Sequence, residues 1–240
     1  MWTKAVGTGG SETGAWLEQT ADNGYIITGT NGSLYLNKVE ASGISVWAKS
    51  YGGTSNDEGK SVQQTPDNGY IVAGFTTSSG AGAIDVFLIK TNASGDTTWT
   101  KTYGGSANDR AYSVDQTSDG GYIICGQTNS FGAGGSDVYL VKVNSTGVVQ
   151  WSKSYGGTGN EEGRSVAETS DGGFIVTGTT SSFGSGGEDI YTIKTDGAGV
   201  VQWSKTFGEF DGDDKSNSIV QTSDGRSEER RVGKECRSRW

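Results

Sequence analysis

Hydrophobic and polar residues alternate in short runs along this chain, and no window shows the sustained 3.6-residue period of a helix. Between Trp47 and Trp99, four runs rich in β-branched and aromatic residues are separated by glycine and polar residues, which predicts four strands. The runs cover residues 61–65, 69–75, 85–91 and 97–103. The chain is therefore expected to be all β.

Two polar segments of this unit have the composition of tight turns. Asp67, Asn68 and Gly69 separate the first two strands, and residues 92–95 (Asn-Ala-Ser-Gly) separate the third from the fourth. Because Asn, Asp and Gly tolerate positive φ, both segments predict hairpins. Each unit is expected to be an antiparallel meander of four strands.

The unit is repeated along the chain. Tryptophan stands at positions 47, 99, 151 and 203, always 52 residues apart, and the sequence between these positions is nearly the same each time. One meander cannot bury both of its faces, but stacked meanders can. Radial stacking gives a β-propeller of four-stranded blades. A flat β-solenoid is the alternative, although solenoid coils are usually shorter and lack two hairpins per unit.

The repeat sets the expected boundaries. A partial strand covers residues 1–8, four units follow at about 9–53, 54–105, 106–157 and 158–208, and a truncated unit covers 209–225. Because closed propellers have ~4 to 8 blades, an incomplete fragment of a larger ring is expected. Unit one is seven residues shorter than the others between Gly29 and Lys38, which indicates a surface loop there.

Residues 226–240 (RSEERRVGKECRSRW) match nothing upstream and resemble the translation of a sequencing adapter, so they are left out of fold reasoning. The alternative is a natural basic tail that binds an acidic partner. The whole chain has a net charge of −9, but the tail holds six basic and three acidic groups, so the rest carries −12. Without Cys236 only Cys125 remains, and no disulfide can form within the repeats.

Several motifs of the unit resemble a known group of proteins: YGGTSNDEGKSV, then DNGYIVAG, DVFLIK, and SG before Trp99. They are similar to the repeats of bacterial and archaeal β-propeller proteins that are secreted or anchored at the cell surface. The resemblance covers Trp2 to Gly225. It implies a blade fold and an extracellular or cell-surface location, and it implies no particular activity.

Histidine is absent, which removes the usual base of a nucleophilic triad and the commonest metal ligand. Paired carboxylates could still perform acid–base chemistry, as in glycoside hydrolysis. The candidates on one expected rim are Asp57, Glu58, Asp85, Asp109, Asp137, Glu161, Glu162, Asp189, Asp211, Asp213 and Asp214. Because most of these carboxylates recur at the same position in every unit, they are expected to stabilise turns, and no catalytic residue is assigned.

Two binding hypotheses follow from irregular positions. Asp211, Asp213 and Asp214 form the densest acidic cluster and are calcium candidates, because calcium takes clustered carboxylate oxygens. Arg110, Tyr112 and Phe131 depart from the repeat and are candidates for a ligand patch, with neutral variation between blades as the alternative. The recurring tryptophans are expected to pack between blades, and a sugar-stacking surface is the alternative.

The function expected from the sequence is a non-enzymatic, exported or cell-surface scaffold for protein or glycan interaction or adhesion. The alternative is a fragment of a carbohydrate-active hydrolase whose acidic catalytic residues lie partly on missing blades. Acids arranged with blade symmetry would favour the scaffold, and one unmatched buried pair would favour the hydrolase. Nucleic acid is not an expected partner at a net charge of −12. No run approaches the ~20 apolar residues of a membrane span.

Overall fold

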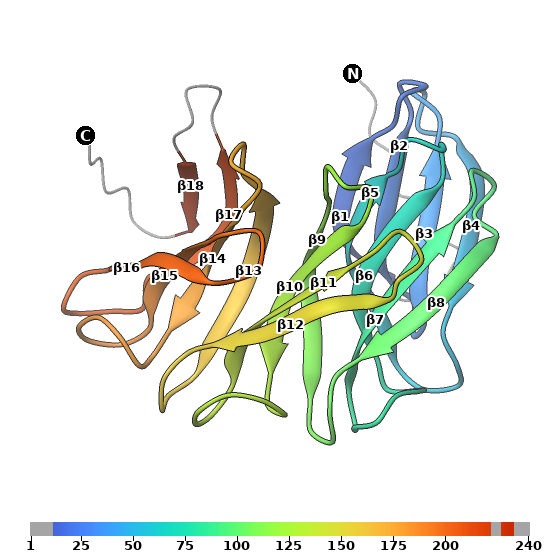
Figure 1. The fold of residues 1–240 in the computed structure, drawn as a ribbon. Helices are drawn as coiled ribbons and strands as arrows, with labels where there is room; N and C mark the ends of the chain where they lie inside the picture. Colours follow the sequence, from blue (N-terminus) through green and yellow to red (C-terminus); the bar gives the residue numbers. More distant parts are fainter. Residues whose placement is uncertain (1–11, 222–226, 233–240) are drawn as a thin grey trace.

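The structure is a computed structural model that describes residues 12–221 and 227–232, and within them every regular element is a β-strand (Figure 1). Four antiparallel sheets of four strands each follow one another along the chain, and each sheet is called a blade below. Blade 1 comprises β1 (Thr13–Gln19), β2 (Tyr25–Thr30), β3 (Leu34–Val39) and β4 (Ser45–Tyr51). Blade 2 comprises β5 (Asp57–Gln64), β6 (Tyr70–Thr76), β7 (Asp85–Thr91) and β8 (Thr97–Tyr103).

Blade 3 comprises β9 (Asp109–Gln116), β10 (Tyr122–Thr128), β11 (Asp137–Val143) and β12 (Val149–Tyr155). Blade 4 comprises β13 (Glu161–Glu168), β14 (Phe174–Thr180), β15 (Asp189–Thr195) and β16 (Val201–Phe207). A two-stranded sheet follows, formed by β17 (Lys215–Gln221) and β18 (Ser227–Val232). Residues 1–8, predicted to be a partial strand, lie outside the described part of the chain, as does most of the tail beyond β18.

The predicted meander is confirmed in all four blades, because the strands pair in sequence order. Both predicted hairpins of unit two are present, with Asn68 at φ 62° and Gly95 at φ 74°. The predicted third and fourth strands, residues 85–91 and 97–103, coincide with β7 and β8. Turn chemistry and strand composition therefore agree with the final pairing in this unit.

The first strand begins earlier than predicted. β5 starts at Asp57, which pairs with Thr76, whereas the sequence pattern predicted a start at Ser61. The polar run from Asp57 to Lys60 lacks apolar alternation, so it has the pattern of a loop. It is nevertheless a strand, because it pairs with β6 through a bulge between Gly59 and Ser61. Gly74 is needed opposite this bulge, where a Cβ would overlap the Glu58 carbonyl oxygen.

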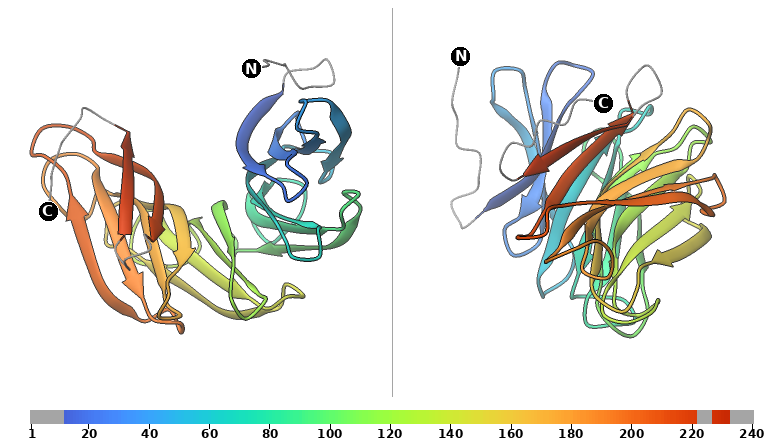
Figure 2. Two further views of the ribbon diagram at one scale, coloured as in Figure 1. Left: turned by 90° about the horizontal axis from the view of Figure 1, so that it is seen from above. Right: turned by 90° about the vertical axis from the view of Figure 1, so that its left-hand side faces the viewer.

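The blades pack face to face, as the repeat predicted. Ile26, Leu34 and Leu36 of blade 1 form one buried cluster with Val72 and Ile89 of blade 2. Equivalent clusters join blade 2 to blade 3 and blade 3 to blade 4. The hydrophobic core is thus divided into layers between blades, and the blades follow an open arc (Figure 2).

The first strand of each blade is the inner one. β5 contacts β1 and β9, and β13 contacts β9 and β17, so the first strands run side by side along the inside of the arc. The fourth strands lie at the outside. Among the described residues, no helix is long and apolar enough to cross a membrane.

Candidate functional site

Three of the four recurring tryptophans, Trp47, Trp99 and Trp151, pack between blades, which confirms the packing prediction for them. Trp47 lies 5.7 Å from the Tyr70 ring of the next blade, and Trp151 lies 5.8 Å from Phe174. Each indole also covers the glycine of the next blade's second hairpin. A Cβ on Gly199 would come within 3.0 Å of the Trp151 ring. This close approach, together with φ of 73°, explains why glycine stands there.

A tyrosine four residues after each of these tryptophans completes the contact. The hydroxyls of Tyr103 and Tyr155 donate hydrogen bonds of 2.8 and 2.7 Å to the carbonyl oxygens of Gly147 and Gly199. Burial raises the pKa of Tyr103 and Tyr155. Both groups therefore stay neutral donors, and their role is structural.

The acids that begin the first strands are buried and hydrogen-bonded in the same way in successive blades. Asp57 accepts from the Gly53 amide at 2.9 Å, Asp109 from the Gly105 amide at 2.8 Å, and Glu161 from the Gly157 amide at 2.7 Å. A serine or threonine at the end of the second strand or just after it also donates to each of them. The predicted role in stabilising turns matches these contacts.

A second series of acids begins the third strands and meets the first series at the blade junctions. Asp85 Oδ1 and Asp109 Oδ2 would lie 2.7 and 2.5 Å from a Cβ on Gly104. Asp137 and Glu161 crowd Gly156 in the same manner at the next junction. Burial raises the pKa of Asp137, and the Glu161 carboxylate adds to the rise, while the Ala133 amide lowers it. The junction pairs thus recur from blade to blade.

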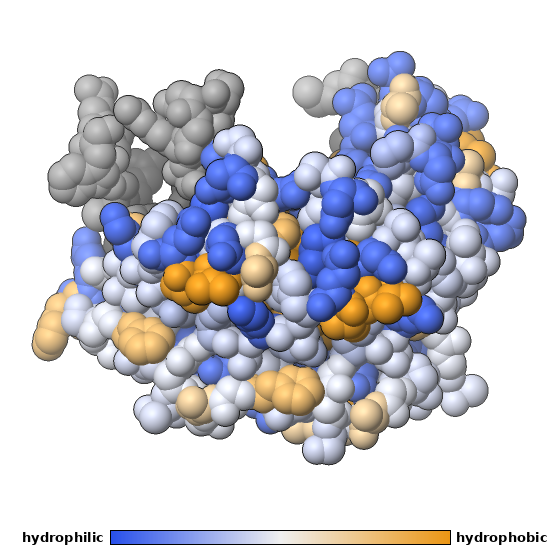
Figure 3. All heavy atoms as spheres, viewed as in Figure 1, coloured by the Kyte–Doolittle hydropathy of each residue, from blue (hydrophilic) through white to orange (hydrophobic). Residues whose placement is uncertain are grey.

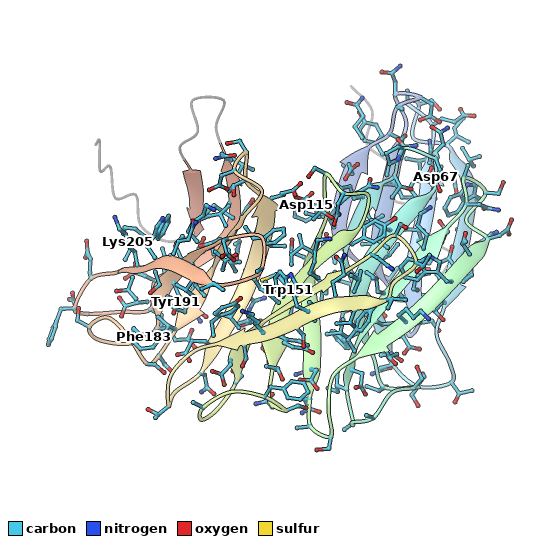
Figure 4. The ribbon with its side chains drawn as sticks, in the orientation of Figure 1. Asp67, Asp115, Trp151, Phe183, Tyr191 and Lys205 are labelled. Carbon is cyan, nitrogen blue, oxygen red and sulfur yellow. The ribbon has the colours of Figure 1, made fainter. Side chains whose placement is uncertain are left out.

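The inner strands are joined by another repeated contact. Glu18 accepts a hydrogen bond from the Gln64 amide at 3.1 Å, and Asp115 accepts one from the Glu168 amide at 3.0 Å. Gln63 makes the equivalent bond to the next blade. Burial raises the pKa of Glu18 and of Asp115, and the neighbouring carboxylates add to both rises. Glu18, Gln63 and Asp115 thus occupy equivalent positions in blades 1, 2 and 3 (Asp115 is labelled in Figure 4).

The first hairpin of each blade carries an ion pair that the sequence analysis did not assign. Lys90 Nζ lies 2.8 Å from Asp67, and Lys142 Nζ lies 2.8 Å from Asp119. The lysine stems are buried along the third strand while the aspartates face solvent. The signal was present in the sequence, since a lysine follows each turn aspartate after 23 residues in these units.

The three calcium candidates have different surroundings. Asp213 Oδ1 accepts from the Glu188 amide at 3.0 Å, Asp214 Oδ2 accepts from the Glu209 amide at 2.9 Å, and Asp211 is exposed. In the described part of the chain, no three His, Cys, Asp or Glu side chains form a group that could hold a metal ion. Calcium binding at Asp211, Asp213 and Asp214 stays a prediction from sequence.

The predicted ligand patch is divided between two places. The Arg110 guanidinium lies 5.5 Å from the Phe75 ring of blade 2, and Tyr112 lies under Arg164 of blade 4 at 4.7 Å. Phe131 stacks instead on Tyr139 of the third strand, with ring centroids 5.7 Å apart. Arg110 and Tyr112 thus stay on the inner strand β9, and Phe131 belongs to the outer half of the blade.

Phe131 lines a shallow concavity of about 330 Å³, the Phe131 groove, with Tyr139, Ser152, Lys153 and Ser154. The Phe131 side chain is 46% exposed although it packs on the buried Tyr139. Aliphatic side chains are also exposed at the second hairpin of three blades: Ile44, Val46, Val148, Val149, Val200 and Val201. Separate hydrophobic patches surrounded by polar surface are visible in Figure 3.

Comparison with solved structures identifies the architecture. The chain is similar to the WD40 domain of Pan2 from Neurospora crassa, with a TM-score of 0.54 and 10% identity over 85% of this chain and 54% of that chain. The fold is a β-propeller. Two further similar structures are a protein of unknown function from Bacteroides caccae (TM-score 0.46, 13% identity, 86% of this chain and 85% of that one) and BamB from Moraxella catarrhalis (0.44, 14%, 84% and 54%).

No protein family model matches this sequence, and no curated protein matches it significantly. The chain spans about half the length of the Pan2 and BamB chains. At these identities the propeller likeness concerns the fold alone, because one propeller architecture supports many functions.

Proposed function

We propose that this chain is a non-enzymatic β-propeller scaffold of an exported or cell-surface protein, and that it binds protein or glycan partners. The observation that carries the proposal is the blade symmetry of the buried acids. The carboxylates at the first-strand station accept from equivalent loop amides and hydroxyls in successive blades. A catalytic pair needs one asymmetric arrangement, whereas repeated contacts of this kind serve the stacking of blades.

The outer surface supports an interaction role. Aliphatic and aromatic side chains recur there although the blades do not use them for stacking. Exposed apolar groups rimmed by polar residues are typical of interaction sites. The exported location and the adhesion role rest on the resemblance to secreted and surface-anchored repeat proteins. Protease accessibility of the protein on intact source cells tests the location.

The second candidate function is a carbohydrate-active hydrolase, and Glu18 and Asp115 are the observation in its favour. Raised carboxyl pKa values are typical of general acids in glycosidases. Against this reading, the Glu18 and Asp115 carboxylates each accept a hydrogen bond from a backbone amide of the next inner strand, and the Gln63 side chain does the same. The scaffold accounts for all three residues with one role.

The test is a pair of assays on the purified chain. We expect no release of reducing ends from a panel of polysaccharides and chromogenic glycosides, and binding to immobilised glycans or proteins with a measurable dissociation constant. Asp115→Asn is expected to leave binding unchanged. Hydrolysis that disappears in Asp115→Asn, with the fold intact by circular dichroism, would establish the hydrolase and refute the scaffold.

A further inference from the structure

The Phe131–Tyr139 ring pair that lines the groove has an equivalent in blade 4 and none in blades 1 and 2. Fifty-two residues further on, Phe183 stacks on Tyr191 with ring centroids 5.4 Å apart, and its side chain is 42% exposed (Figure 4). In blade 2, Ser79 and Phe87 stand at the positions of Phe131 and Tyr139. Blade 1 lacks this loop. Since blade 2 forms without the pair of aromatic rings, stacking of blades does not require it.

The lining combines an apolar surface with hydroxyl groups. Phe131 contacts Tyr139 and, at its tip, the Gly105 loop, and 46% of the side chain stays exposed to solvent. Ser152 hydrogen bonds with the Tyr139 hydroxyl, and Ser154 pairs directly with Tyr139 across the strands. A sugar ring presents C–H groups on one face and hydroxyls at its edge. An aromatic surface with adjacent hydroxyls therefore matches a saccharide in both respects.

The charge around the groove favours a neutral saccharide. Ser152 and Ser154 lie on the Tyr139 side of β12. Lys153 lies between them and also lines the groove, but strand side chains alternate, so its ammonium group is directed to the opposite face of the sheet. The equivalent Lys205 lies over Trp203, away from Phe183 (Figure 4). The Asp109 carboxylate is a negative charge that acts on the Tyr139 hydroxyl. A sugar acid would be repelled by it.

We propose that the Phe131 groove and the equivalent Phe183–Tyr191 surface of blade 4 each bind one or two rings of a neutral saccharide. The inference rests on the proposed scaffold function and names the partner class for it. A volume of about 330 Å³ lies near the lower limit of small-molecule sites, which run from ~300 to 1,000 Å³. The groove is shallow, so a single site binds weakly.

Two equivalent sites on consecutive blades can together bind one polysaccharide more tightly than a single site does. A polysaccharide that reaches both sites binds the second one intramolecularly, which raises overall affinity by ~10²- to 10⁴-fold over a single site. We therefore expect a neutral polysaccharide to bind much more tightly than its own disaccharide. The ratio should fall to about one when either phenylalanine is removed.

The experiment is isothermal titration of the full chain with soluble neutral polysaccharides (xyloglucan, galactomannan and a β-glucan), their oligosaccharides, and polygalacturonate as the acidic comparison. The test variant is Phe131→Ser with Phe183→Ser, which installs the residue that blade 2 carries. We expect it to lose at least about a hundredfold in affinity for polysaccharide, the lower end of the gain from binding at two sites. Ser79→Ala is the matched control and should bind as the unmodified chain does.

A gain-of-function variant protects the test against misfolding. Ser79→Phe with Phe87→Tyr builds a third groove in blade 2, and we expect it to tighten polysaccharide binding. Binding that is unchanged in the Phe131→Ser, Phe183→Ser chain would overturn the groove assignment and leave the scaffold proposal standing. Binding of proteins without any neutral saccharide would do the same. A chain that binds neither class would overturn both proposals.

Discussion

Trp151 and Trp203 occupy the same place in neighbouring blades, yet their surroundings differ. Trp151 packs against Phe174 and covers the Gly199 hairpin of blade 4. Trp203 is 41% exposed, and the Lys205 ammonium lies 5.8 Å from its ring. The comparison shows that a blade supplies half of each contact and its neighbour supplies the other half. Stability in such an array is a sum over junctions.

Removing the two indoles should therefore have unequal effects. We expect Trp151→Ala to lower the free energy of unfolding by about 3 kcal/mol, because it leaves a cavity over Gly199 and Phe174. Trp203→Ala should cost less than about 1 kcal/mol, as exposed substitutions do. Urea denaturation at 25 °C measures both. Equal losses would show that the indole acts within its own blade and would contradict the junction model.

The glycine under the indole gives a second comparison. Gly199 and Gly172 have nearly the same φ, 73° and 75°. A Cβ added to Gly199 would meet the Trp151 ring, whereas a Cβ added to Gly172 would have no atom within 4 Å. Gly172→Ala should cost about 1 kcal/mol from backbone strain alone. Gly199→Ala should cost about 2 kcal/mol more, because the indole has to move. Thermal unfolding of the two variants separates strain from packing.

The tyrosine of the junction provides a smaller test. Tyr155→Phe removes the hydrogen bond to the Gly199 carbonyl and should cost about 1 kcal/mol. Blade 4 has Phe207 at this station, so Phe207→Tyr serves as the reverse change. We expect it to leave the free energy of unfolding unchanged. A gain from Phe207→Tyr equal to the Tyr155→Phe loss would mean that the hydroxyl acts without a neighbouring hairpin.

Each hairpin ion pair joins two residues of the same blade, so its contribution to stability should not depend on the neighbouring blade. Burial raises the pKa of Asp119, but hydrogen bonds from Lys142, Thr117 and the Gly121 amide outweigh it and bring the pKa to about 2, below the ordinary 3.8. The stabilisation is therefore present above about pH 4 and lost as the pH falls toward 2. Because Asp119 is half exposed, it amounts to at most about 1 kcal/mol.

Lys142→Met should flatten the acid limb of the stability curve between pH 4 and 2, measured by urea unfolding at each pH. Lys194→Met, which removes the same ion pair from blade 4, should flatten it equally. A larger effect in blade 3 would show that these pairs also depend on the junction.

Much of the blade could be predicted from the sequence. Strands β7 and β8 and both hairpins followed from apolar runs and from residues that tolerate positive φ, because these are local properties of the chain. The start of β5 at Asp57 could not be predicted, since its polar run forms a strand only by pairing with β6. The ligand patch failed to form as one group for a similar reason. Arg110 and Tyr112 lie on the inner strand β9, which contains a bulge, whereas Phe131 lies in the loop between β10 and β11.

The 52-residue period by itself determined the all-β class, the meander and the stacking of one unit on the next, because only a neighbouring copy can bury the apolar faces that every unit carries. The tertiary structure alone decided which of these side chains are covered. Trp151 and Trp203 have equivalent positions in the sequence, yet only Trp151 is covered by a neighbouring blade. Their burial and their contacts depend on what the adjoining blade and loop place beside them, which is a long-range property that no local pattern contains.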